Sequence, residues 1–235
     1  MKMLKTRRQW ILSGAVLLLI LAVVYGAWSA SGHNNKYKGL ALNSEVALDD
    51  GMRNLIESQI KVSQAALEAQ LKSGQKVDLN LYTSIAWDAT MLGDLVLARE
   101  TYEAYFEKNT LNYTAWNNYA NVLKDMGDFD RAESAYKEAY TLYGNEAYYR
   151  DYIEFIDNHS VDGNRDEEIN QVLEDAVSEI GQTPYFMIKL ASLYEKRGDC
   201  EQMNAHYNVA KTLLPDNKEL PEEIATANKN CAEVN

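Results

Sequence analysis

The sequence predicts an all-α protein: a solenoid of about four helix pairs, preceded by one transmembrane helix and closed by a C-terminal capping helix. Three observations support this prediction. A long apolar segment lies near the N-terminus, and a pattern of apolar, small and Gly-Asp positions recurs every 34 residues. Only 3 of the 235 residues are proline, which favours helices over loops.

The first 44 residues predict a membrane anchor followed by a linker. Residues 1–9 are basic, and residues 10–30 are uncharged and mostly apolar. Trp10 and Trp28 bracket a helical length of about 27 Å, close to the thickness of bilayer hydrocarbon. The positive flank places the N-terminus in the cytoplasm and the body of the chain across the membrane. Residues 31–44 form a polar linker.

A cleaved signal peptide is the alternative interpretation of this segment. The apolar run exceeds the roughly 7–15 residues that are usual in such peptides. Ala30, a candidate cleavage position, has the bulky Trp28 two residues before it, which disfavours cleavage. Both alternatives place the body of the chain outside the cytoplasm.

A stripe of small residues lies within the predicted transmembrane helix. Ala22, Gly26 and Ala30 are spaced four residues apart and so share one helical face. Such stripes let transmembrane helices approach closely, which makes this face a candidate packing surface. Glycine and alanine are common in such segments anyway, so a stripe without function is the alternative.

Residues 45–235 form the predicted helical repeat domain. Its first helix carries one apolar stripe and ends at Gly74. The stripe contains Met52, Ile56, Ile60, Leu67 and Leu71.

Self-comparison then reveals the repeat. Six positions recur 34 residues later: Tyr82, Ala86, Gly93, Asp94, Ala98 and Tyr102 become Trp116, Ala120, Gly127, Asp128, Ala132 and Tyr136. A shift of 71 residues gives Met187, Ala191, Gly198, Asp199, Met203 and Tyr207. The intervening unit keeps two apolar stripes around a polar loop at 159–166. The predicted repeats span about 79–112, 113–145, 146–182 and 183–216, and the capping helix spans 218–230.

This pattern resembles the tetratricopeptide repeat, most clearly over residues 113–142. The resemblance implies helix pairs that stack and bury one another's apolar faces. Ala120 and Ala132 let two helices approach closely, while Gly127 ends the first helix and Asp128 is expected to cap the second. Many of the 16 tyrosines are explained as half-buried fillers, Tyr136 among them.

The resemblance also implies a concave groove lined by the first helix of each repeat, where proteins of this class bind peptides. Asparagine amides both donate to and accept from an extended backbone, and Arg150 is suited to a carboxylate. The family's clamp for C-terminal carboxylates needs more basic residues than this chain has, and exposed side chains without function are the alternative. The groove positions carried over are Trp87, Met91, Asn117, Asn121, Lys124, Arg150, Glu154, Ile188, Ser192 and Glu195.

The two cysteines predict a disulfide. Cys200 begins the last repeat's second helix, and a capping helix that folds back antiparallel brings Cys231 close to it. Outside the cytoplasm such a bond is permitted, and closing a loop of about 30 residues contributes roughly 3–4 kcal/mol in the chain-entropy model. Two unpaired thiols are the alternative.

The residues do not predict an enzyme. No metal-ligand spacing, cofactor motif or catalytic constellation is present, so neither a metal nor a cofactor is expected. The net charge is −12. Beyond the basic N-terminus the chain has 19 of its 23 basic residues and all 35 acidic ones, so the body of the chain is acidic. An acidic body disfavours nucleic acid as a partner.

Anchor and repeats together look like bacterial envelope proteins, with the N-terminus cytoplasmic and the repeats periplasmic at the inner membrane. We therefore expect a membrane-anchored adaptor or chaperone that uses its groove to assemble envelope protein complexes. Its partners would be exported clients or complex subunits, with the lipid bilayer engaged through one helix and no small-molecule substrate. The alternative is a permanent subunit of an inner-membrane complex, such as cytochrome c maturation or secretion machinery.

Overall fold

The computed structural model describes residues 36–159 and 165–234. The chain divides into two units, residues 1–42 and 43–235. In the described part of the first, the Leu40 amide donates to the Tyr37 carbonyl at 3.1 Å. The transmembrane helix predicted at 10–30, with its Ala22, Gly26 and Ala30 stripe, lies outside the described residues. Among the helices that are described, none combines the length and apolarity needed to cross a membrane.

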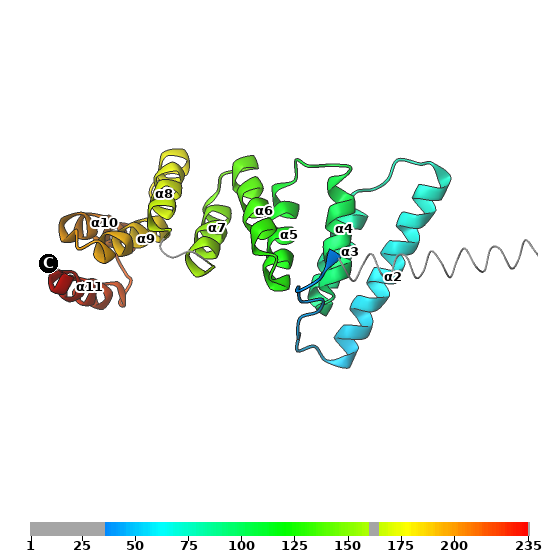
Figure 1. Ribbon diagram of the computed structural model, residues 1–235, viewed down its shortest axis with the longest axis horizontal. Coiled ribbons are helices and arrows are strands. Elements are labelled where there is room, and N and C mark those ends of the chain that lie inside the picture. The colour runs from blue at the N-terminus through cyan, green and yellow to red at the C-terminus, as the bar shows by residue number, and fades with distance from the viewer. Residues whose placement is uncertain (1–35, 160–164, 235) are drawn as a thin grey trace, which may run out of the picture. The chain divides into compact units, whose positions relative to one another are not determined.

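The second unit is an all-α solenoid, as predicted (Figure 1). Each helix packs on its neighbour in chain order, so that one helix pair follows another. Its ten helices, counted over the described residues, begin with α2 (Asp50–Ser73). Four pairs follow: α3 (Asn80–Leu92) with α4 (Leu95–Phe106), α5 (Tyr113–Met126) with α6 (Phe129–Leu142), α7 (Glu146–Asn158) with α8 (Asp166–Ile180), and α9 (Pro184–Lys196) with α10 (Cys200–Leu213). The last helix is α11 (Leu220–Val234).

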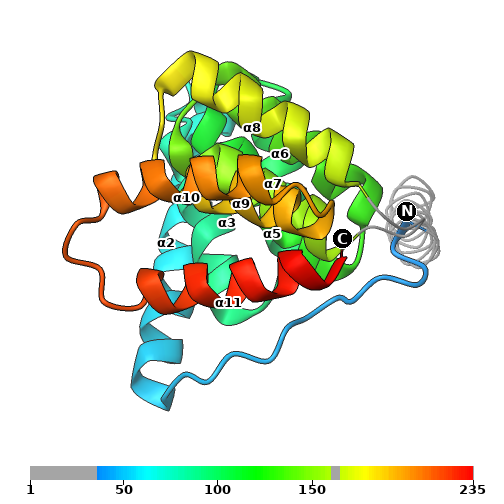
Figure 2. The same ribbon diagram turned by 90° about the vertical axis from the view of Figure 1, so that its left-hand side faces the viewer.

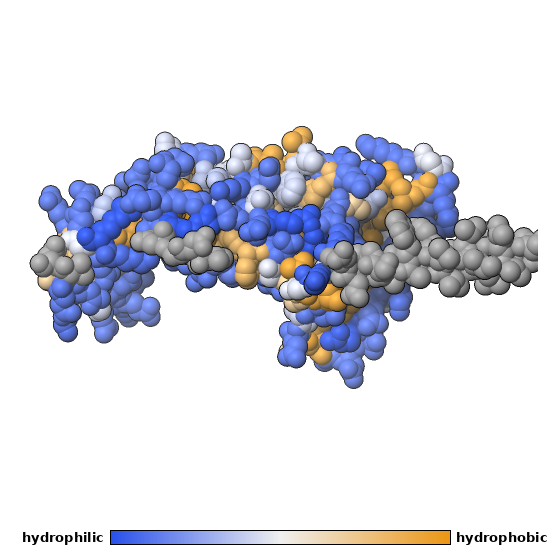
Figure 3. All heavy atoms as spheres, viewed as in Figure 1, coloured by the Kyte–Doolittle hydropathy of each residue, from blue (hydrophilic) through white to orange (hydrophobic). Residues whose placement is uncertain are grey.

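Small residues lie where paired helices cross. Ala120 on α5 and Ala132 on α6 are both 0% exposed. Such complete burial is expected where two helices pack closely against small side chains. Tyr136 fills the space beside them and is 2% exposed. Apolar side chains therefore gather between the helices, while the face in Figure 3 is largely hydrophilic with scattered apolar patches.

The Gly-Asp turn works differently in two successive repeats. Gly93 and Gly127 both end a helix in the left-handed conformation, with φ of 79° and 81°. Asp94 caps α4 by accepting a hydrogen bond from the Leu97 amide at 3.0 Å. The expected cap at Asp128 is wrong: its carboxylate makes no capping bond to α6 and instead accepts from Arg99 Nη1 at 3.1 Å. The Arg99 side chain is 2% exposed and donates to both Glu103 and Asp128, so the Asp128 carboxylate serves a buried guanidinium in place of the helix.

A polar network joins the degenerate third unit to the second. The Arg165 guanidinium donates to both carboxylate oxygens of Glu133 on α6, at 2.8 Å each. Its Nε also donates to Glu168 on α8 at 2.8 Å, and Glu168 accepts from Tyr152 of α7 at 2.8 Å. Charge-assisted bonds therefore connect three helices beside the polar loop, where the repeat pattern is weakest.

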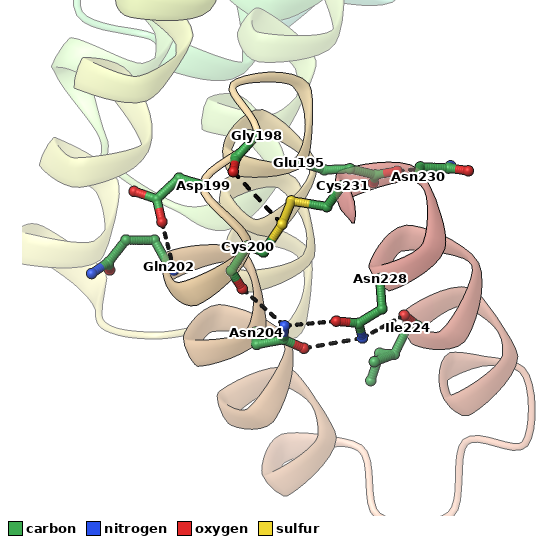
Figure 4. Close-up of a disulfide and its surroundings, with 10 residues drawn as sticks. All are labelled: Glu195, Gly198, Asp199, Cys200, Gln202, Asn204, Ile224, Asn228, Asn230 and Cys231. Carbon is green, nitrogen blue, oxygen red and sulfur yellow. Dashed lines mark hydrogen bonds between the residues drawn. A yellow bond between two sulfur atoms is a disulfide. The ribbon is translucent and has the colours of Figure 1, made fainter. Parts of the chain in front are cut away.

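Helix α11 folds back to lie beside α10 and α9 (Figure 2). Cys200 and Cys231 are joined by a disulfide with Cα atoms 5.7 Å apart (Figure 4). Beside it, the amides of Asn204 and Asn228 exchange two hydrogen bonds, at 2.7 and 3.1 Å. Leu220 is 2% exposed, so the start of α11 is also packed down. This helix therefore covers one end of the repeats through a covalent bond, paired amides and apolar contacts.

Candidate functional site

The predicted groove positions all lie on the first helices of the pairs, α3, α5, α7 and α9. They differ in accessibility. Trp87 and Met91 on α3 are 51% and 39% exposed, so two large apolar side chains face solvent. Arg150 and Glu154 on α7 are exposed as well. Asn117 is buried, at 8% exposure, which differs from the exposed amide expected at this groove position.

A polar hollow of about 140 Å³ lies between α5 and α7. Three of the predicted residues, Asn121, Lys124 and Glu154, line it. The remaining lining residues were not predicted from the sequence, and they are Tyr136, Asp151, Phe155, Asn158 and His159. The structure therefore brings the middle of the predicted groove together around one hollow.

Amide and hydroxyl groups beside this hollow are bonded to each other. Asn117 Nδ2 donates to Asp151 Oδ2 at 2.8 Å, which ties α5 to α7. Asn121 Nδ2 donates to the Asn117 carbonyl at 3.0 Å. The side-chain oxygen of Asn121, Oδ1, accepts from the Tyr136 hydroxyl at 2.8 Å and from Lys124 Nζ at 3.0 Å. Both ends of the Asn121 amide are thus engaged, so an arriving peptide backbone would have to exchange these bonds for its own.

Carboxylates set the electrostatic character of the hollow. Asp151 and Glu154 line it opposite a single ammonium, that of Lys124. Burial raises the pKa of the Tyr136 hydroxyl, and the negative charges of Asp151 and Asp125 raise it further. The hollow is therefore better suited to a donor or cation than to an anion.

The remaining predicted positions lie toward the C-terminal end. Arg150 places its guanidinium 5.8 Å from the centre of the Tyr185 ring, a cation–π geometry that holds the charge against α9. Ile188 and Ser192 on α9 are half-buried. Glu195 accepts a hydrogen bond from Asn230 of α11 at 2.9 Å and so takes part in holding the capping helix. We call the surface formed by α3, α5, α7 and α9 the first-helix face. These residues extend that face but do not line the hollow.

The sequence matches the model of one known protein family. Residues 67–208, more than half of the chain, match the model of the PRP39 N-terminal HAT repeat, and the chain belongs to this family. None of the curated proteins matches the sequence significantly.

Solved structures show the same fold. A tetratricopeptide repeat protein from Parabacteroides merdae has a TM-score of 0.56 at 14% identity, covering 78% of this chain and 72% of that one. MamA has a TM-score of 0.54 at 14% identity, covering 77% and 99%. YrrB, described as a TPR protein with an unusual peptide-binding site, has a TM-score of 0.53 at 13% identity, covering 74% and 89%. The chain is a TPR-like repeat protein, a fold typical of interaction scaffolds rather than enzymes.

Proposed function

We propose that this chain is a protein-interaction module that binds an extended segment of a partner along its first-helix face. The observation that carries the proposal is the polar hollow between α5 and α7, around which Asn121, Lys124 and Glu154 gather. Trp87 and Met91 add exposed apolar surface on α3, where a partner's apolar side chains would gain burial. YrrB, similar in fold, is described as having a peptide-binding site, which supports a peptide-like ligand.

We also propose that residues 10–30 anchor the chain in a bacterial inner membrane, with the repeats outside the cytoplasm. The uncharged apolar segment and its basic flank support this orientation. The disulfide between Cys200 and Cys231 supports it too, because such bonds persist in oxidising compartments. In this location the module would act as an adaptor or chaperone in assembling envelope protein complexes.

Copurification of the full-length protein from mild-detergent extracts of its native membranes tests the proposal. A broad set of substoichiometric exported proteins supports an adaptor, and Arg150→Glu should then reduce their recovery. Lys211→Glu is the matched control, because it reverses an exposed charge on α10, away from the first-helix face. Unchanged recovery with Arg150→Glu would show that this part of the face does not bind.

The same experiment addresses the alternative of a permanent subunit. A defined, nearly stoichiometric set of partners would identify one complex and favour that alternative. Gly26→Leu should then release the complex, because a bulky residue blocks close helix packing in the membrane. An adaptor would keep its clients in the Gly26→Leu variant, and the purified repeats without residues 1–35 would keep their affinity for those clients in vitro.

A further inference from the structure

A second, larger hollow lies between α4, α5 and α6, away from the predicted groove positions. Its volume is about 620 Å³. We call it the aromatic cleft, and its lining residues are Glu103, Phe106, Glu107, Trp116, Tyr119, Arg131, Ser134, Ala135 and Glu138. Two of the three helices, α4 and α6, are the second helices of their pairs, whereas the proposed groove uses the first helices.

The apolar part of the cleft is held in place before any partner arrives. The rings of Phe106 and Trp116 stack with their centres 3.8 Å apart and their planes 13° from parallel. Tyr119 meets Phe106 edge-on at 5.5 Å. The Trp116 indole donates to the Thr110 carbonyl at 2.8 Å, which fixes its orientation. A ligand would therefore meet an ordered aromatic surface and lose little free energy in ordering it.

The charged part of the cleft is acidic. Three carboxylates line it against one guanidinium, that of Arg131. Arg131 already pairs with Glu103 at 3.3 Å. Glu107 and Glu138 are both exposed. Glu107 has one ion-pair partner, Lys108 at 3.8 Å, whereas Glu138 has none within 4.0 Å among the described residues. Glu138 can thus receive a positive charge, and Glu107 can do so in place of its long, exposed contact with Lys108.

We propose that the aromatic cleft docks a lysine or arginine side chain, flanked by apolar residues, from a basic segment of a partner protein. The methylene stem of such a side chain packs on the rings of Phe106 and Trp116, and its head reaches Glu107 and Glu138. An anionic segment would meet like charge at the same edge. The inference rests on the proposed function only in requiring a protein partner, and it uses a different face.

Titration of the full-length protein in detergent with synthetic peptides tests this. The probe is a capped nonapeptide in a Gly/Ser background with a central Leu-Lys-Leu, and norleucine or glutamate replaces the lysine in two comparison peptides. The indole N–H resonances of the tryptophans report binding, with Trp116 assigned from Trp116→Phe. Trp87, on the first-helix face, is the internal reporter for the groove.

The lysine peptide should shift the Trp116 resonance and bind about tenfold more tightly than the glutamate peptide at low salt. Glu138→Lys should weaken binding about fivefold or more, whereas Glu174→Lys, an exposed charge reversal on α8, should leave it unchanged. Ser134→Trp, which fills the cleft from an exposed position, should abolish the shift.

Three results would overturn the inference. A Trp87 shift without a Trp116 shift would place binding in the groove, so the proposed function would survive and the cleft would not. Equal affinity for the norleucine and lysine peptides would remove the role of the positive charge. An unchanged affinity in Glu138→Lys would remove the role of the acidic edge.

Discussion

Gly93 and Gly127 end corresponding helices with nearly equal φ, but their surroundings differ. A Cβ at Gly93 would lie 2.2 Å from the Ser44 carbonyl oxygen, whereas one at Gly127 would meet nothing within 4 Å. The close approach exists because the Ser44 amide donates to the Gly93 carbonyl at 3.0 Å. Glycine is therefore required at residue 93 by both the left-handed backbone and the close contact with Ser44, and at residue 127 by the left-handed backbone alone.

Alanine at these two positions should separate strain from steric clash. Gly127→Ala should destabilise the domain by about 1–2 kcal/mol, the cost of a left-handed alanine. Gly93→Ala should cost about 1–3 kcal/mol more, because the clash also displaces the strand-like contact at residues 43–44. Urea denaturation of both variants measures the difference. Equal decreases in the free energy of unfolding would mean that the segment around Ser44 moves aside without a measurable cost.

Glu133 should make the domain sensitive to acid. The hydrogen bonds from Arg165 lower the pKa of its carboxyl below the ordinary value near 4.5, despite an opposing effect of burial. A lowered pKa means that the ionised form stabilises the fold above the unfolded-state pKa and that this contribution is lost as pH falls through the lower, folded value.

Glu133→Gln should therefore destabilise the protein by about 1–2 kcal/mol at pH 7, because one bidentate pair becomes a neutral contact. The difference from the unaltered protein should shrink below about pH 4.5. Glu138→Gln, on the same helix but exposed, is the control and should change stability by less than about 0.5 kcal/mol. A pH-independent effect of Glu133→Gln would show that the ion pair is not its cause.

At the scale of helices, the disulfide should act locally. It joins α10 to α11 over a sequence separation of 31 residues, which corresponds to roughly 3–4 kcal/mol in the chain-entropy model. Since repeats contact only their neighbours, the loss of this bond should propagate little along the solenoid.

Reduction of the full chain should therefore raise amide hydrogen exchange in α9, α10 and α11 and leave α5 and α6 nearly unchanged. Cys231→Ser should reproduce the effect without reductant. Exchange measured by mass spectrometry, with peptides from each helix, checks both. A uniform increase across all helices would contradict local coupling and indicate that the solenoid unfolds as one cooperative unit.

The helices also show what the sequence can predict. Pairing follows from alanine and Gly-Asp positions, because each of these residues requires a particular local geometry whatever surrounds it. The contact from Asn117 to Asp151 joins residues 34 apart, so the period itself points to Asp151, which was not among the predicted groove residues. The aromatic cleft has no such signal. It depends on how the end of α4 faces α6, which is a matter of tertiary packing.

The same limit applies to side-chain direction. First-helix positions are predictable from the repeat register. The burial of Asn117 and the hydrogen bonds already made by the Asn121 amide instead depend on rotamers and on Tyr136 of the paired helix. Binding by the groove residues stays a prediction. At Asp128 the repeat pattern favours a cap, but the carboxylate accepts from buried Arg99 instead. Arg99 also donates to Glu103, so Asp128 supplies a second anionic partner for this buried guanidinium.

For the whole molecule, the proposed anchor and the C-terminal disulfide are linked by compartment. An N-terminal segment that carries the repeats across the membrane would expose Cys200 and Cys231 to oxidising conditions, and the structure places them within bonding distance. A chain retained in the cytoplasm would keep both thiols reduced. The redox state of the C-terminal end therefore reports on the function of the first 35 residues.

Alkylation of intact cells followed by intact-mass measurement tests this link. The full-length chain should resist alkylation and weigh about two mass units less than its reduced form, because forming the bond removes two hydrogen atoms. Deletion of residues 1–35 should leave both cysteines reactive, since the repeats then stay in the reducing cytoplasm. Replacing the deleted segment with a cleavable secretory signal should restore the bond. A disulfide in the cytoplasmic form would break the link and remove the bond as support for an extracytoplasmic domain.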